Sequence, residues 1–419
     1  MNILIKSAEI IDSRSNYNGQ VLDVQITNGV ITAIGNNLHA EENATVIPAD
    51  GLKLSIGWCD IRSSFRDPGF EHKEDIRSGC AAAAFGGYTD VAVLPNTKPA
   101  VEHKETVHYI KNSAVGPVSV HPMAFVTLGA KGEEMTEMLD LHHAGAVAFT
   151  DANKPIWHPG VLVRSLQYLQ LVDGLLIQHA EETTLTLHGQ INEGKVSTFL
   201  GLKGIPKLAE ELIVARDIEL LKYAGGRIHF SRISSPKSIE LIKAAKKQGL
   251  NVTCDVAVHH LLFTDKDLNT FDTNLKVNPP LRSKETQTAL WKAVNEDIID
   301  LIVTDHTPQD EESKKLEFDQ AEFGMLGLQT AFAALNTVGK IPVDKLVNIL
   351  SITSRELLKI EVPTIEVGAK ANLTLFSTDE NWTFTEKDVK SKSLNTPFIG
   401  KTFKGKVKAV INKNQLVIN

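Results

Sequence analysis

Several features are scarce in this sequence of 419 residues, and each absence excludes a class of protein. The three cysteines, Cys59, Cys80 and Cys254, lie in apolar segments and form no CxxC motif, which favours buried thiols in a reducing compartment over disulfides. No apolar run approaches the ~18 residues of a membrane span, and the N-terminus has no long apolar signal segment. We therefore expect a soluble, cytoplasmic protein that does not enter a membrane.

The sequence also lacks an excess of positive charge. It has 44 Lys and Arg residues against 51 Asp and Glu residues, a net charge of -7, so nothing points to a nucleic-acid partner. No GxGxxG motif follows a strand-like run, which weakens a dinucleotide-binding interpretation. What is present is ordinary globular composition, 42% hydrophobic and 23% charged, with enough length for one barrel-sized domain and a smaller one.

Strand-like and helix-like runs alternate through the middle of the chain. This alternation is typical of stacked βα units, and eight units favour a closed (β/α)8 TIM barrel, an α/β fold, over an open sheet. We assign residues 52–365 to this barrel. The expected strands are 54–60, 88–94, 119–126, 145–150, 174–179, 226–231, 250–256 and 299–304.

Both ends of the chain read as short strands separated by turns rich in Asn and Gly. Residues 1–51 and 366–419 share this texture, although the whole barrel separates them in sequence. We expect the two ends to assemble into one small β-sandwich domain.

Polar side chains gather where the barrel strands end, and in TIM barrels the C-terminal ends of the strands carry the chemistry. The first strand runs out into Asp60, Arg62, Ser64 and Arg66. The ends of later strands add Asn96, Asp151, Ala152, Asn153, His179, Arg232 and Asp305, and Asn278 lies between the last two strands. These residues are the candidates for a functional site.

Several motifs now point to one family. Phe65-Arg66-Asp67-Pro68-Gly69 is followed by Glu71-His72-Lys73-Glu74-Asp75, and Pro95-Asn96-Thr97-Lys98-Pro99 follows the second strand. Further along come Val277-Asn278-Pro279-Pro280-Leu281-Arg282, Thr304-Asp305-His306 and Ser393-Leu394-Asn395-Thr396-Pro397-Phe398. In order and spacing, this set resembles the longer bacterial type of dihydroorotase, in the amidohydrolase superfamily. The resemblance extends over essentially the whole chain.

The resemblance implies a zinc site at the barrel mouth that opens or closes the cyclic amide of dihydroorotate in pyrimidine biosynthesis. Its ligands would be an H-x-H after strand one, a carboxylate at strand four, histidines at strands five and six, and an aspartate at strand eight. In this chain, those positions hold Arg62, Ser64, Ala152, His179, Arg232 and Asp305. Arginine has no lone pair for a metal, and a serine hydroxyl is a poor ligand beside imidazole. We therefore predict no metal cofactor.

Two of the implied ligands remain, and each has a structural alternative. His179 is either a surviving ligand or a hydrogen-bonded core histidine, and Asp305 is either a vestigial catalytic base or half of an ion pair. Without zinc, a buried Asp305 would be left unpaired at high cost. We predict that Arg62, Arg232 or both pair with Asp305 and fill the space of the metal.

The positions that hold the substrate in the family are better kept. Arg66, Asn96 and Asn278 stand there, and a guanidinium suits bidentate carboxylate recognition. The alternative is that Arg66 and Asn96 only tie down the loops around Pro68 and Pro95.

Three functional interpretations remain open. The first is a dihydroorotase-like protein without hydrolase activity, expected to be a homodimer and an assembly partner of aspartate carbamoyltransferase, a role that the resemblance suggests by precedent. The second is an active cyclic-amide hydrolase with a rearranged mononuclear zinc site that uses His179, Asp305 and Asp151 or His229. The third is kinship with hydantoinase-related, metal-free assembly proteins.

Overall fold

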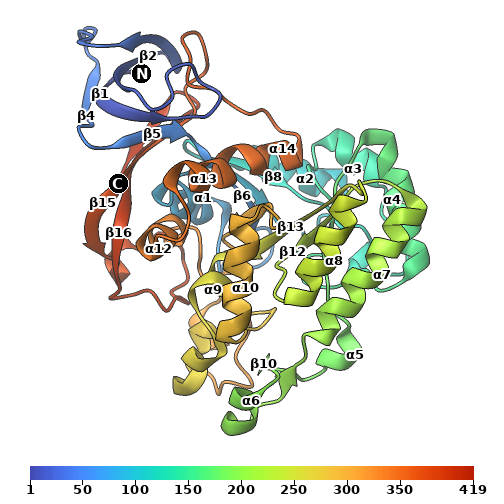
Figure 1. Cartoon of the computed structure of the whole chain (residues 1–419). Helices are drawn as coiled ribbons and strands as arrows, with labels where there is room; N and C mark the ends of the chain where they lie inside the picture. The colour runs from blue at the N-terminus through green and yellow to red at the C-terminus, as the bar shows by residue number, and fades with distance from the viewer.

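The two ends of the chain pair in one eight-stranded sheet, as the computed structural model, which describes residues 1–419, shows in blue and red (Figure 1). β5 pairs in parallel with β1 and antiparallel with β15, which joins the N-terminal strands to the C-terminal ones. Apolar side chains such as Ile3, Val24, Leu54 and Leu375 form the core of this domain. The strands are β1 (Asn2–Ile11), β2 (Val21–Thr27), β3 (Val30–Gly35), β4 (Thr45–Pro48), β5 (Lys53–Ile56), β15 (Leu373–Thr383), β16 (Thr402–Asn412) and β17 (Gln415–Ile418).

The middle of the chain forms a closed ring of parallel strands. Two sheets, in the orders β6-β7-β8 and β14-β13-β12-β9, are linked by bridges from Phe149 to Ala124 and to Leu176, and from Ser63 to His306. The strands are β6 (Trp58–Ser63), β7 (Tyr88–Val93), β8 (Ser119–Pro122), β9 (Leu176–His179), β12 (Ile228–Ser231), β13 (Val252–Ala257) and β14 (Leu301–Val303). The predicted fold class, a (β/α)8 barrel with a small β-sandwich, is confirmed. The domain limits at 51/52 and 365/366 stay a prediction.

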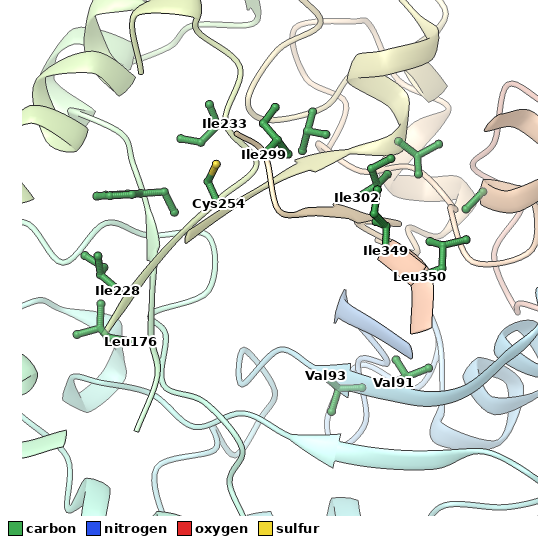
Figure 2. Close-up of a cluster of buried hydrophobic side chains, with 14 of the residues drawn as sticks. Val91, Val93, Leu176, Ile228, Ile233, Cys254, Ile299, Ile302, Ile349 and Leu350 are labelled. Atoms are coloured by element: carbon green, nitrogen blue, oxygen red, sulfur yellow. The ribbon is translucent and has the colours of Figure 1, made fainter. Parts of the chain in front are cut away.

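Helices cover the outside of the ring (Figure 1). Side chains such as Leu176, Ile228 and Cys254, from three neighbouring strands, belong to the largest buried cluster (Figure 2). The longer helices are α1 (Ile76–Phe85), α2 (Lys104–Asn112), α3 (Met138–Ala144), α4 (Pro159–Leu169), α7 (Leu208–Ala224), α8 (Pro236–Lys247), α10 (Lys284–Asn295) and α12 (Ala331–Val338). Shorter ones are α5 (Thr183–Thr186), α6 (Lys195–Leu200), α9 (Val258–Leu262), α11 (Glu311–Lys314), α13 (Val343–Asn348) and α14 (Ser354–Leu358).

Two local expectations differ from the structure. The predicted strand 54–60 is two strands, β5 and β6, because the backbone at Gly57 bonds to Asn372 and β5 joins the terminal sheet. The predicted strand 145–150 pairs only through isolated bridges at Phe149. After the loop that follows β6, α1 begins at Ile76, where the Asp75 side chain caps the first turn.

The three cysteines, Cys59, Cys80 and Cys254, are free and buried, as the sequence predicts. None of the helices combines the length and the hydropathy that a membrane crossing requires.

A buried arginine joins α14 to the barrel strands. Arg355 donates to the Gly57 carbonyl (2.6 Å), to Thr89 Oγ1 (3.0 Å) and to Asp90 Oδ2 (2.6 Å). Burial alone would raise the pKa of Asp90, but the hydrogen bond from His121 and the charge of Arg355 outweigh it and hold that pKa well below its usual range. Asp90 is therefore an ionised carboxylate inside the protein.

Replacing Arg355 with Met should destabilise the fold by about 3 kcal/mol or more, because it leaves the buried Asp90 charge without its main partner. Urea unfolding at neutral pH measures the change. Arg77→Met is the matched control, since Arg77 is exposed and should stay within about 0.5 kcal/mol of the parent protein. Equal unfolding midpoints for the two variants would contradict the prediction.

Candidate functional site

The candidate residues converge at the barrel mouth, as expected for the C-terminal ends of parallel strands. Arg62 lies on β6, His179 ends β9, Arg232 directly follows β12, and Asp305 follows β14. All four are at most 5% exposed. The residue types in this small volume are two cations, one carboxylate and one imidazole.

Arg62 and Asp305 form a buried ion pair. Arg62 Nε donates to Asp305 Oδ1 over 3.0 Å. Burial and the nearby charge of Arg232 lower the pKa of Arg62 to about 10, although Asp305 opposes the shift. At neutral pH the guanidinium is therefore still protonated.

Arg232 contacts the other oxygen of the same carboxylate. Its Nη1 lies 3.4 Å from Asp305 Oδ2 and 2.5 Å from the carbonyl oxygen of Asn278. Burial would raise the pKa of Asp305, but the charges of Arg232 and then Arg62 leave it lowered. The predicted pairing is confirmed for both arginines.

Two further residues complete the contacts, and sequence reasoning assigned neither of them a role. Asn153 Oδ1 accepts from Arg62 Nη2 (2.7 Å) and from Arg232 Nη2 (3.1 Å), so one amide oxygen bridges the two guanidiniums. Glu181 Oε2 lies 2.7 Å from His179 Nε2. The only sequence signal for them is their place beside Ala152 and His179 in the strand-end motifs.

The backbone at the barrel mouth has unusual dihedral angles. Arg66, Ala152, Arg232 and Asp305 all have positive φ, between 46° and 61°, in the left-handed region that side chains with a Cβ rarely adopt. Such residues cluster at active and binding sites, where surrounding contacts hold the strain. The barrel mouth thus has the local backbone geometry of a functional site.

The residues present do not fit a zinc ion. No group of three or more His, Cys, Asp or Glu side chains is arranged to hold a metal. A guanidinium occupies each side of Asp305, and a hydrogen bond from Arg232 Nη2 (3.1 Å) occupies the His179 Nδ1 lone pair. Ser64 is buried beside the cluster, but a serine hydroxyl is a poor zinc ligand.

The two reserve ligands of the rearranged-site interpretation also point elsewhere. Asp151 accepts from the backbone of Val126 and Thr127, and His229 bonds to Asp255 (2.9 Å). Neither contacts His179 or Asp305 in the structure. A rearranged metal site built on these two residues is therefore not preformed.

Two of the three predicted substrate-binding residues, Arg66 and Asn278, already form hydrogen bonds within the protein. Arg66 Nε donates to the Pro308 carbonyl (3.3 Å), and Asn278 Nδ2 donates to Glu181 (3.0 Å). The cavity that His179, Glu181 and Asn278 line together measures only about 10 Å³, roughly the space of one water molecule. Binding roles for Arg66, Asn96 and Asn278 stay a prediction.

Two adjacent histidines are buried near the site. His259 and His260 are both 2% exposed at the start of α9. His259 Nε2 lies 3.9 Å from Asp305 Oδ2, so a third basic side chain lies close to that carboxylate. The other adjacent pair, His142 and His143, is partly or fully exposed.

The charged stretch 309–320 is partly buried. Gln309 and Lys314 are 5% exposed. Gln309, where the family resemblance implies a substrate-binding histidine, accepts from Lys73 Nζ (2.7 Å) and donates to the Phe323 carbonyl (2.8 Å). Its side chain therefore ties loops together.

The chain is similar to known proteins both in sequence and in structure. Residues 53–238 match a family model described as Dihydro-orotase-like. Dihydroorotase of Caldanaerobacter subterraneus subsp. tengcongensis is 40% identical over 99% of this chain and 97% of its own length, and that of Acetivibrio thermocellus is 38% identical over 99% of each. Among solved structures, L-hydantoinase (dihydropyrimidinase) from Arthrobacter aurescens superposes with a TM-score of 0.88 at 22% identity, covering 100% of this chain and 96% of that one.

The two buried histidines make a contribution to stability that is lost in mild acid. Burial lowers the pKa of His259 to about 4 and that of His260 well below its usual value, so the folded protein resists protonation that the unfolded chain accepts near 6.5. The contribution of His259 is fully present above pH 6.5 and is lost as the pH drops toward 4, by about 3 kcal/mol.

Urea unfolding between pH 7.5 and pH 4.5 (about three units around the histidine range) measures this loss. His259→Asn should flatten the dependence, whereas His143→Asn, at an exposed position, should leave it unchanged. The same slope for the parent and His259→Asn proteins would refute the assignment.

Proposed function

Because this chain belongs to the dihydroorotase family, we propose that it acts in pyrimidine biosynthesis as a member that has lost zinc-dependent hydrolysis and serves as a non-catalytic partner. One observation carries the proposal. Arg62 and Arg232 both contact Asp305, at positions where the resemblance implies metal-binding histidines.

The chemistry of hydrolysis explains why these contacts matter. A bound zinc lowers the pKa of water from 15.7 to about 7, which supplies hydroxide at neutral pH. Arginine stays protonated and can neither ligate the ion nor remove a proton. Asp305, with its pKa lowered and its oxygens engaged by guanidiniums, is a weak base. The remaining side chains therefore offer no efficient route to hydroxide.

The partner that we propose is aspartate carbamoyltransferase, with this chain as a homodimeric structural component. The support is the precedent that the family resemblance carries, together with a site that has no replacement chemistry of its own. A chain that kept its whole fold while its metal positions changed is suited to a structural role.

A second candidate is an active cyclic-amide hydrolase, and the names of the relatives favour it. Proteins called dihydroorotase are 38–40% identical to this chain over nearly its full length. Such activity would need Arg62 and Arg232 to leave Asp305 and a metal to bind His179 and Asp305. His259, with a buried Nε2 that has no hydrogen-bond partner and lies 3.9 Å from Asp305, would be a third donor only after such a rearrangement.

Metal analysis and a dihydroorotate hydrolysis assay on one chelator-free preparation distinguish the two candidates. We expect substoichiometric zinc and no turnover approaching the ordinary enzyme value of about 10 per second. The matched variant combines Arg62→His, Ser64→His, Ala152→Asp and Arg232→His, and should bind zinc where the parent does not. A zinc-loaded parent protein with ordinary turnover would overturn the proposal.

Co-migration tests the partner. Mixed at micromolar concentration with aspartate carbamoyltransferase of the same organism, the protein should elute from a sizing column in one larger complex. Alone, it should elute as a dimer. Separate elution of the two proteins would rule out this partnership while leaving the metal question to the assay above.

A further inference from the structure

Charged side chains at the barrel mouth compensate one another without a metal. Two guanidiniums, Arg62 and Arg232, contact the buried carboxylate of Asp305, and His179 lies between Arg232 and the half-buried Glu181. Because a guanidinium can only donate, His179 Nδ1 must accept, and its proton lies on Nε2, which donates to Glu181. Burial and the charge of Arg232 lower the pKa of His179 and keep the ring neutral.

We infer that these side chains form a metal-free cross-link that holds the barrel mouth closed. We call this group the arginine clasp, and its members are Arg62, Asn153, His179, Glu181, Arg232 and Asp305. They come from the ends of five different barrel strands or strand segments, counting the one at Phe149. The clasp rests on the proposed function only in that a metal-dependent hydrolase would have to break it.

The clasp also closes the mouth over a residue where the family binds substrate. Glu181 accepts from the Asn278 side chain (3.0 Å), and Arg232 donates to the Asn278 carbonyl (2.5 Å). The side-chain Nδ2 and the backbone carbonyl of Asn278 are thereby engaged. His179 and Glu181, two members of the clasp, line the cavity of about 10 Å³ beside Asn278, so the clasp bounds the space next to that residue.

Asn153 is the exposed end of the clasp. Two like-charged guanidiniums repel each other, and the amide oxygen of Asn153 lies between them and accepts from both. Hydrogen bonds to charged groups are stronger than neutral ones. The side chain is otherwise solvent-exposed, so it can be changed without opening the core.

A double-mutant cycle in urea unfolding tests the buried half of the clasp. Arg62→Met and Asp305→Asn should each lower the folding equilibrium constant by about a hundredfold or more, because the first removes the shorter ion pair of the buried Asp305 and the second removes the carboxylate that faces two buried guanidiniums. The double variant should lose far less than the product of the two single losses. Losses that simply multiply would overturn the cross-link, whatever the hydrolysis assay shows.

Asn153 keeps the test decisive if the buried variants fail to fold. Asn153→Ala should lower the folding equilibrium constant by roughly tenfold, whereas Asn153→Asp, which keeps an acceptor, should retain stability. Asn36→Ala, at an exposed asparagine with no side-chain bond, is the matched control. Equal stability of Asn153→Ala and Asn36→Ala would contradict the role of Asn153.

Hydrogen exchange measures whether the barrel mouth is closed, separately from the global stability of the protein. In the parent protein, amides of residues 276–282 should be protected to the same degree with and without a chelator, because no metal holds the mouth. In Asn153→Ala they should exchange roughly tenfold faster or more under native conditions. Unchanged exchange in the variant, or loss of protection on adding chelator to the parent, would overturn the clasp.

Discussion

A carboxylate buried at the barrel mouth needs positive charge close by, and the arrangement around Asp305 follows from that requirement. Transferring an ionised group from water costs several kcal/mol unless a partner compensates. Arg62 and Arg232 supply the compensation within hydrogen-bonding or ion-pairing distance, and the pKa of Asp305 is lowered as a result. The two guanidiniums have further acceptors, because Asn153 Oδ1 accepts from both and His179, which bonds to Glu181, accepts from Arg232.

The same device appears where the barrel meets α14. There Asp90 is the buried carboxylate, and Arg355 links it to the Gly57 carbonyl between β5 and β6. An arginine can bond to a carboxylate and to a backbone carbonyl at the same time because its planar group presents several donors in fixed directions. At this junction it joins the two parts of the fold, and at the mouth it joins strand ends. Buried arginine is thus a recurrent cross-link in this chain.

Periodicity predicted most of the fold, because alternating apolar runs report directly on burial. It failed at Gly57, where contact with Asn372 splits one apolar run into two strands, and at Phe149, where bridging replaces regular pairing. The site was predictable as far as single strand ends go, down to the pairing of Asp305. Asn153 and Glu181 were not, because their roles arise only when separate strands place them beside Arg62 and His179.

Fold and chemistry can separate in this chain because different residues determine them. The barrel is held by the apolar cluster beneath its helices and by the terminal sheet, and none of the six clasp residues belongs to either core cluster. The 38–40% identity to dihydroorotases therefore reports on packing, whereas hydrolysis would depend on a few strand-end side chains. The buried charge of Asp305 has to be neutralised whatever residues surround it. A guanidinium meets that demand and has no lone pair for a metal, so Arg62 and Arg232 can stabilise the fold at this point without any ion.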